Sequence, residues 1–159
     1  MNEELKLIRI GDFDSNIFKV AVYERIDHKE YTVNEIRIKD DTNIDFVLDE
    51  KLVGFWHAID FVHHPLEFNL NHRQFKGELS LQKMSFLPDG DVHINYIGND
   101  FVKQARFTKD YIIDFCLPDT LSKYIIKEID EKTYLIIEWK SGDYVYGGFV
   151  SGYYVLVKD

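Results

Sequence analysis

Aromatic residues that carry a polar tip gather near the carboxyl end of the chain. Trp139 precedes Tyr144 and Tyr146, and Tyr153 and Tyr154 follow shortly after. Such side chains combine a large apolar face with a hydrogen-bonding group, which suits an amphipathic small molecule held in a mostly apolar cavity. The same residues also suit plain core packing, because side chains can fill the interior of a small β-barrel. The cluster therefore predicts ligand binding and leaves solid packing as the alternative.

Asp60 is the second candidate, since it shares its parity with Trp56 in the longest apolar run of the chain, residues 52–62. If the Trp56 face points into the core, Asp60 enters the core too, and a buried carboxylate needs partners or a proton. Asp60 then either contacts a ligand or ties down the loop that follows. The alternative places the opposite stripe, with Phe55 and Phe61, in the core and leaves Asp60 in water.

Histidines and one cysteine complete the residues with chemical potential. Five of the six histidines lie between His57 and His93, but their spacing matches no recognised metal-ligand motif. Cys116 lies in the apolar segment 112–117, which favours a buried, unreactive thiol. No serine occupies a nucleophile-elbow pattern. We therefore expect no metal, no cofactor and no catalytic residue, and a protein that is not an enzyme.

Strand signals recur about every ten to fifteen residues. We therefore expect β-strands to position most of these residues. The expected strands cover residues 17–25, 30–38, 52–62, 77–86, 91–97, 104–115 with a break, 122–129, 133–140, 143–147 and 152–158. Pro88 with Gly90, and Ser141-Gly142-Asp143, predict tight turns. A change of apolar parity near Gln82-Lys83 predicts a β-bulge. Residues 61–76 lack strand character, and we expect a loop across one end of a barrel, as a lid over a cavity or as a plug.

Length and charge narrow the class of protein. A chain of 159 residues fits one domain, which we divide into an N-terminal hairpin extension (1–47) and a barrel (48–159). A net charge of −9, with Lys and Arg dispersed, disfavours nucleic acid as a partner. No apolar stretch approaches the ~20 residues of a membrane-spanning helix, so we expect no membrane insertion. The first residues lack a signal-peptide layout and one cysteine allows no internal disulfide, which favours the cytoplasm.

An ordered set of short motifs follows Asp49. They are Val53-Gly54-Phe55-Trp56, Asp60-Phe61-Val62, Lys76-Gly77-Glu78-Leu79, Phe86-Leu87-Pro88-Asp89-Gly90, Glu138-Trp139-Lys140-Ser141-Gly142-Asp143-Tyr144 and Tyr153-Tyr154-Val155-Leu156. This set resembles a lipocalin-like bacterial domain, familiar as an appendage of membrane metallopeptidase regulators of the β-lactamase-sensor type. The resemblance implies a barrel in which Trp56 packs at the closed end beneath a basic residue from a late strand, Lys158 or Lys140. The His-Glu-x-x-His motif of the metallopeptidase does not occur, so the resemblance does not imply protease activity.

We therefore predict an all-β protein with a single antiparallel lipocalin-like β-barrel of about 8–10 strands. The predicted function is non-enzymatic: binding of a small amphipathic or hydrophobic ligand, or a sensory role. The predicted ligand contacts are Trp56, Asp60, Trp139, Tyr144, Tyr146 and Tyr153. The alternative is an interaction module with a filled barrel, which binds a protein partner through an edge strand or through the loop at 61–76.

Overall fold

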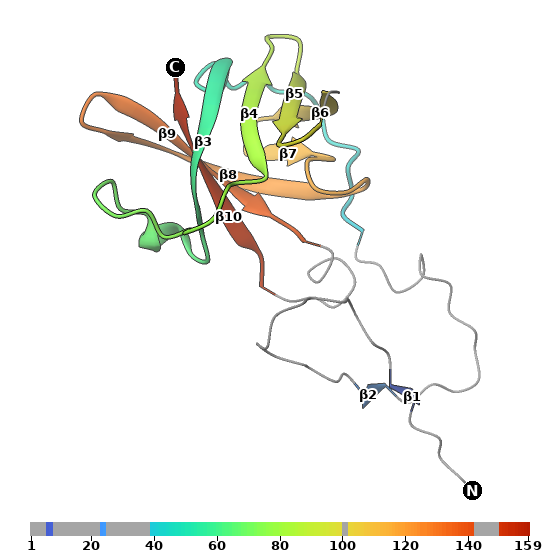
Figure 1. Ribbon diagram of the computed structural model, residues 1–159. Coiled ribbons are helices and arrows are strands. Elements are labelled where there is room, and N and C mark those ends of the chain that lie inside the picture. Colours follow the sequence, from blue (N-terminus) through green and yellow to red (C-terminus); the bar gives the residue numbers. More distant parts are fainter. Residues whose placement is uncertain (1–5, 8–22, 25–38, 100–101, 142–149) are drawn as a thin grey trace, which may run out of the picture.

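Eight antiparallel strands close into a barrel in the computed structural model, which describes residues 6–7, 23–24, 39–99, 102–141 and 150–159. The strands are β3 (Gly54–Val62), β4 (Leu81–Phe86), β5 (Asp91–Tyr96), β6 (Lys103–Thr108), β7 (Tyr111–Ile113), β8 (Leu121–Ile129), β9 (Lys132–Trp139) and β10 (Gly152–Lys158). Each strand pairs with the next along the chain, and β10 returns to pair with β3 (Figure 1). The predicted all-β barrel is confirmed.

Smaller elements lie outside the barrel wall. Strand β1 (Lys6–Leu7) pairs antiparallel with β2 (Tyr23–Glu24) in a separate two-stranded sheet, and η1 (Pro65–Glu67) is a short 3-10 helix. Within the described ranges, no helix is long and apolar enough to cross a membrane. The predicted strands at 30–38 and 143–147, and all but the first residue of the predicted turn at 141–143, lie outside the described residues. The division at residue 47 stays a prediction.

Two predicted local features are confirmed on β4. The turn after this strand is closed by hydrogen bonds from the Leu87 N–H to the Asp91 carbonyl (2.9 Å) and from the Gly90 N–H to the Leu87 carbonyl (3.1 Å). Gly90 has a φ of +97°, a conformation that L side chains rarely adopt. The register between β4 and β5 shifts between Leu81 and Lys83, where the β-bulge was expected.

A second β-bulge, which the sequence pattern did not reveal, lies in β3. Val155 of β10 pairs with Asp60, but the next residue, Leu156, pairs with Ala58, so one residue of β3 is left over. The bulge changes which residues of β3 face the core. Trp56 and Ala58 therefore pack inside the barrel, whereas Asp60 lies on the outer face beside Val155.

Apolar side chains from all eight strands fill the barrel interior. The largest of those that are fully buried are Trp56, Phe86, Phe107, Phe115, Leu81, Met84, Ile94, Ile112, Leu135 and Ile137. A second, smaller cluster of Val62, Ile136 and Val155 lies on the outer face of β3, β9 and β10. Burial of apolar surface on both faces of these three strands explains why their sequences are almost continuously apolar.

Residues 39–53 form a strap that lies against the barrel beside β6, β7 and β8 (Figure 1). The Asp40 N–H donates to the Asp119 carbonyl (2.9 Å), and the Val47 N–H donates to the Thr108 hydroxyl (2.8 Å). Further along, the Tyr124 hydroxyl donates to the Asp49 carboxylate (2.7 Å). The strap thus carries the chain to the start of β3.

Candidate functional site

Trp56 seals one end of the barrel. Its side chain is 1% exposed, and its indole N–H donates to the Leu52 carbonyl at 2.7 Å. The Lys158 ammonium lies 5.3 Å from the centre of the Trp56 ring and donates to the Lys51 carbonyl (2.8 Å). The basic partner that the lipocalin resemblance implies is therefore Lys158. Lys140, the other candidate, forms a largely buried ion pair with Asp40 at 2.8 Å.

Trp139 belongs to an aromatic cluster at the opposite end of the interior. The centre of its ring system lies 5.2 Å from that of Phe115, 5.5 Å from Tyr154 and 6.4 Å from Tyr96, each in edge-to-face geometry. Burial raises the pKa of both the Tyr96 and the Tyr154 hydroxyl. Of the predicted aromatic wall, Trp139 and Tyr154 thus lie together, and they pack against each other and against Phe115 and Tyr96.

The remaining predicted contacts lie elsewhere. Tyr153 pairs with Val62 and packs on the outer-face cluster, so its side chain points away from Trp139. Tyr144 and Tyr146 lie outside the described residues. The structure therefore places Trp56 and Trp139 inside the barrel and Tyr153 and Asp60 outside it. One ligand in the interior would not meet all four, and their roles as ligand contacts stay predictions.

Asp60 is 3% exposed and anchors the loop that follows β3. Its carboxylate accepts the backbone N–H groups of Phe61 (2.8 Å), Gln74 (2.9 Å) and Phe75 (2.9 Å). Both alternatives weighed from the sequence were wrong about its surroundings. The bulge in β3 turns Asp60 away from the interior, but the loop then covers it and keeps it from water. Of the two roles predicted for a buried Asp60, these hydrogen bonds support the tie to the loop.

We expected the loop at 61–76 to lie across one end of the barrel. In the structure it packs mainly on the outer face. The Phe68 ring lies 5.2 Å from the Tyr134 ring of β9, and the Lys127 ammonium donates to the Pro65 carbonyl at 3.4 Å. The last part of the loop lies near the barrel end, where the centre of the Phe75 ring is 6.2 Å from that of the Phe61 ring. The bulge explains the difference, because it exposes Asp60 and the apolar outer cluster for the loop to cover.

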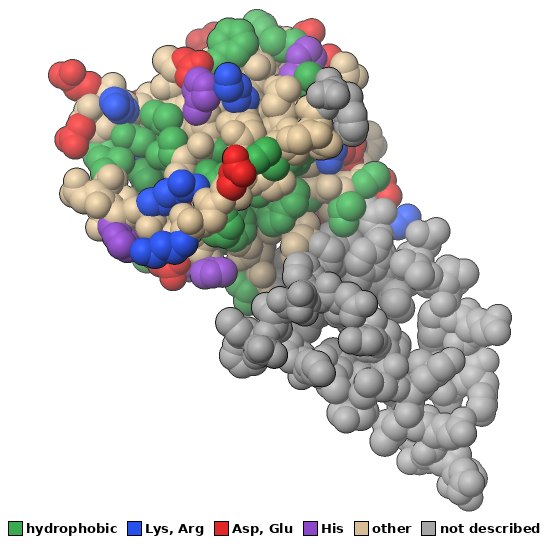
Figure 2. Space-filling view, in the orientation of Figure 1, with side chains coloured by type: hydrophobic (Ala, Val, Ile, Leu, Met, Phe, Trp, Pro, Cys, Tyr) green, Lys and Arg blue, Asp and Glu red, His purple; other side chains and the backbone are tan. Residues whose placement is uncertain are grey.

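A pocket of about 260 Å³ remains between this loop and the barrel, and we call it the loop pocket. It is lined by Ile59 and Asp60 of β3, Phe68, Asn69, Leu70 and Arg73 of the loop, Lys132 and Tyr134 of β9, and Val157 of β10. Five of the nine lining residues are aliphatic or aromatic, and the other four are polar or charged, two of them cationic. Figure 2 shows Lys, Arg and His side chains gathered on the side of the barrel where the loop lies.

Sequence reasoning missed all of this pocket except Asp60. Its residues come from one loop and three strands, up to about 100 positions apart in the chain, so no local pattern links them. A weak signal was present in Phe68 and Leu70, two of several apolar residues in a loop that also contains three histidines and two asparagines. A second pocket, of about 250 Å³, lies between the strap and the barrel, with Phe46 and Arg106 among its lining residues. The loop pocket lies on the outer face of the barrel, whereas the second pocket borders Phe107 of the interior cluster.

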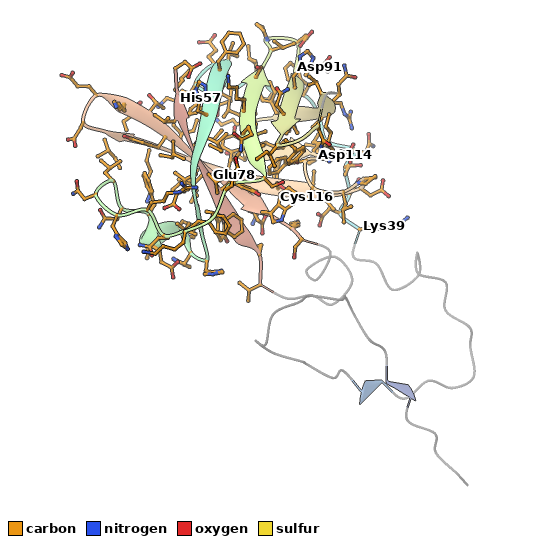
Figure 3. All side chains as sticks on the ribbon, viewed as in Figure 1. Lys39, His57, Glu78, Asp91, Asp114 and Cys116 are labelled. Carbon is orange, nitrogen blue, oxygen red and sulfur yellow. The ribbon has the colours of Figure 1, made fainter. Side chains whose placement is uncertain are left out.

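Cys116 and His57 lie in different parts of the molecule (Figure 3). Cys116 is buried as predicted, with its sulfur 3.6 Å from the Ser122 hydroxyl, and burial raises the pKa of the thiol to about 11. His57 pairs with the Asp159 carboxylate through Nδ1. Within the residues that the structure describes, no group of three or more His, Cys, Asp or Glu side chains could hold a metal ion.

Three comparisons with known proteins, covering family models, curated proteins and solved structures, found no match to this chain.

Proposed function

We propose that the protein binds a small amphipathic molecule without chemical conversion, and that the molecule occupies the loop pocket. The observation that carries this proposal is the pocket itself, a hollow of about 260 Å³ in which aliphatic and aromatic side chains lie beside polar and charged ones. That combination is typical of small-molecule sites. A lipocalin-like barrel would be expected to hold its ligand in the barrel interior. Here the described interior side chains are close-packed, which favours the loop pocket as the binding site.

The size of the loop pocket limits the ligand. Its volume lies just below the range of about 300–1,000 Å³ that is usual for small-molecule sites, so a molecule of modest size is favoured. Ile59, Val157 and Phe68 supply the surface for an apolar body, and Asn69 and Tyr134 offer polar groups.

The anchoring of the loop by Asp60 favours binding. Three backbone N–H groups, two of them from residues 74 and 75, are held by one buried carboxylate. A pocket whose wall is fixed before the ligand arrives loses less conformational entropy on binding. Cytoplasmic location and a sensory use of the bound state are parts of the same proposal. Lipocalin-like architecture supports it through the barrel and through the stacking of Lys158 on Trp56.

The proposal is tested by nuclear magnetic resonance of Ile, Leu and Val methyl groups during titration with a panel of small amphipathic compounds. We expect shifts at Ile59, Leu70 and Val157. Leu70→Asp should weaken binding about tenfold or more, because it puts a charge on the apolar wall. Leu66→Asp is the matched control, since Leu66 lies on the same loop, is 81% exposed and does not line the pocket. Shifts confined to interior methyl groups, or no shifts with any compound, would contradict the proposal.

Protein–protein interaction is the second candidate, favoured by apolar side chains on the strap. Phe46 is 51% exposed and Val47 52%, and Ile44 and Leu48 beside them are also exposed. Strands β3 to β10 close into a barrel and leave no edge strand among them, so we place the contact surface on the strap rather than on the barrel wall. A partner recovered with the wild-type protein should be lost with Val47→Asp and retained with Leu66→Asp. Retention by both variants would remove the strap as the contact surface.

A further inference from the structure

We infer that the loop pocket selects an organic carboxylate, with its charged head held by Arg73 and Lys132 and its apolar body on the barrel wall. This inference rests on the proposed function and adds the chemical class of the ligand. Both cations line the pocket. They come from different elements, since Arg73 belongs to the loop and Lys132 opens β9.

The hydrogen-bonding capacity of the two cations is mostly unused. Nη2 of Arg73 donates to the Gly77 carbonyl at 2.9 Å, which fixes the side chain and leaves further guanidinium N–H groups for a ligand. Among the described residues, the Lys132 ammonium has neither a hydrogen bond nor an ion pair. A guanidinium offers two parallel N–H groups that match the two oxygens of a carboxylate.

Asp60, which lines the pocket, and Glu67 of the loop are already engaged. Both oxygens of Asp60 accept backbone N–H groups, and Glu67 accepts those of His63 (3.1 Å) and His64 (3.3 Å). Glu67 is the only acidic residue in segment 61–76, which also contains Arg73 and Lys76. In a chain with a net charge of −9, this loop is therefore a local region that favours an anion.

The apolar part of the pocket sets the body of the ligand. Ile59 and Val157 present branched aliphatic surface, and Phe68 and Tyr134 form an aromatic pair whose rings lie 5.2 Å apart. The volume of about 260 Å³ favours a medium-length alkyl chain or a single aromatic ring over a long lipid chain. A medium-chain or aromatic carboxylate meets both the charge and the size.

Octanoate and 1-octanol are the probes that test this inference, because they share an eight-carbon chain and differ in the charged head. Methyl resonances of Ile59, Leu70 and Val157 report binding to the full chain. We expect octanoate to bind about tenfold or more tightly than 1-octanol, and its affinity to fall as salt is raised. Lys132→Gln and Arg73→Gln should each reduce octanoate affinity several-fold and reduce the affinity for 1-octanol much less.

Lys76→Gln is the matched control, since Lys76 lies in the same loop but does not line the pocket. It should change octanoate affinity less than about twofold. Arg73→Gln also removes a hydrogen bond within the loop, so Lys132→Gln is the variant that tests the charge alone. Thermal unfolding checks that both variants are folded. Equal affinity for octanoate and 1-octanol, or no effect of Lys132→Gln, would overturn the carboxylate inference and leave the binding proposal standing. Failure of both probes and of the wider panel to shift the pocket methyl groups would overturn the two together.

Discussion

Strand β3 passes through two different environments. Its first half places Trp56 in a close-packed interior, where the ring has almost no exposed surface. Its second half places Asp60 under a loop that leaves a pocket beside it. One β-bulge separates the two halves. Along this strand, the loop pocket lies beside the half that a loop covers, and the described residues around the other half are close-packed.

Replacement of Trp56 should have the largest effect on stability. Trp56→Ala removes the largest fully buried side chain and leaves a cavity, so we expect a loss of about 3–5 kcal/mol in the free energy of unfolding, measured in urea. Phe55→Ala is the neighbouring control, because Phe55 is 63% exposed; it should cost less than about 0.5 kcal/mol. Similar losses in the two variants would mean that the interior is not close-packed around Trp56.

Removal of the Asp60 carboxylate should come next. Asp60→Ala leaves three backbone N–H groups without their acceptor, of which those of residues 74 and 75 hold the loop. We expect a loss of about 2–3 kcal/mol in unfolding free energy and faster proteolytic cleavage within 63–76, followed by mass spectrometry of the fragments. Unchanged cleavage in this variant would show that the loop is held by its apolar contacts alone.

Lys158 should contribute less than either residue. Lys158→Met keeps the aliphatic stem over the Trp56 ring but removes the ammonium, and with it the cation–π contact and the bond to the Lys51 carbonyl. We expect a loss of about 1 kcal/mol by chemical denaturation. Lys83→Met, at an exposed position of β4, should be nearly neutral. Equal losses of unfolding free energy in Lys158→Met and Lys83→Met would show that the charge of Lys158 does not stabilise this end of the barrel.

Replacement of Cys116 should have the smallest effect on stability, and its reactivity tests whether solvent reaches the barrel interior. Burial raises the pKa of its thiol from 9.0 to about 11, so the folded protein keeps the proton longer than the unfolded chain does. The stabilisation is complete below about pH 9 and declines as the pH rises to about 11. Unfolding measured across this range should therefore lose less stability in Cys116→Ala than in the wild type. Rapid alkylation of folded Cys116 by iodoacetamide at pH 8 would indicate an open interior.

The sequence predicted the barrel well because its signals are local. Alternation within strands and turn residues such as Gly90 act over a few positions, and even the bulge in β4 left its mark as a change of parity. The face of Asp60 was not predictable in this way, because the bulge in β3 is defined by pairing with a strand about 95 residues later. The loop pocket was missed for the same reason. Lys158 and Lys140 were also indistinguishable until the strands were placed.

The pairing of β3 with β10 also governs when the barrel can form. These strands are the first and last of the wall, and Lys158 lies opposite Trp56. During synthesis, one edge of β3 therefore stays unpaired until residues 152–158 have left the ribosome. Because contacts between such distant residues also require closure of a long loop, this step should be late and slow in refolding as well. The nascent chain is most exposed to aggregation during this interval, before its last strand is in place.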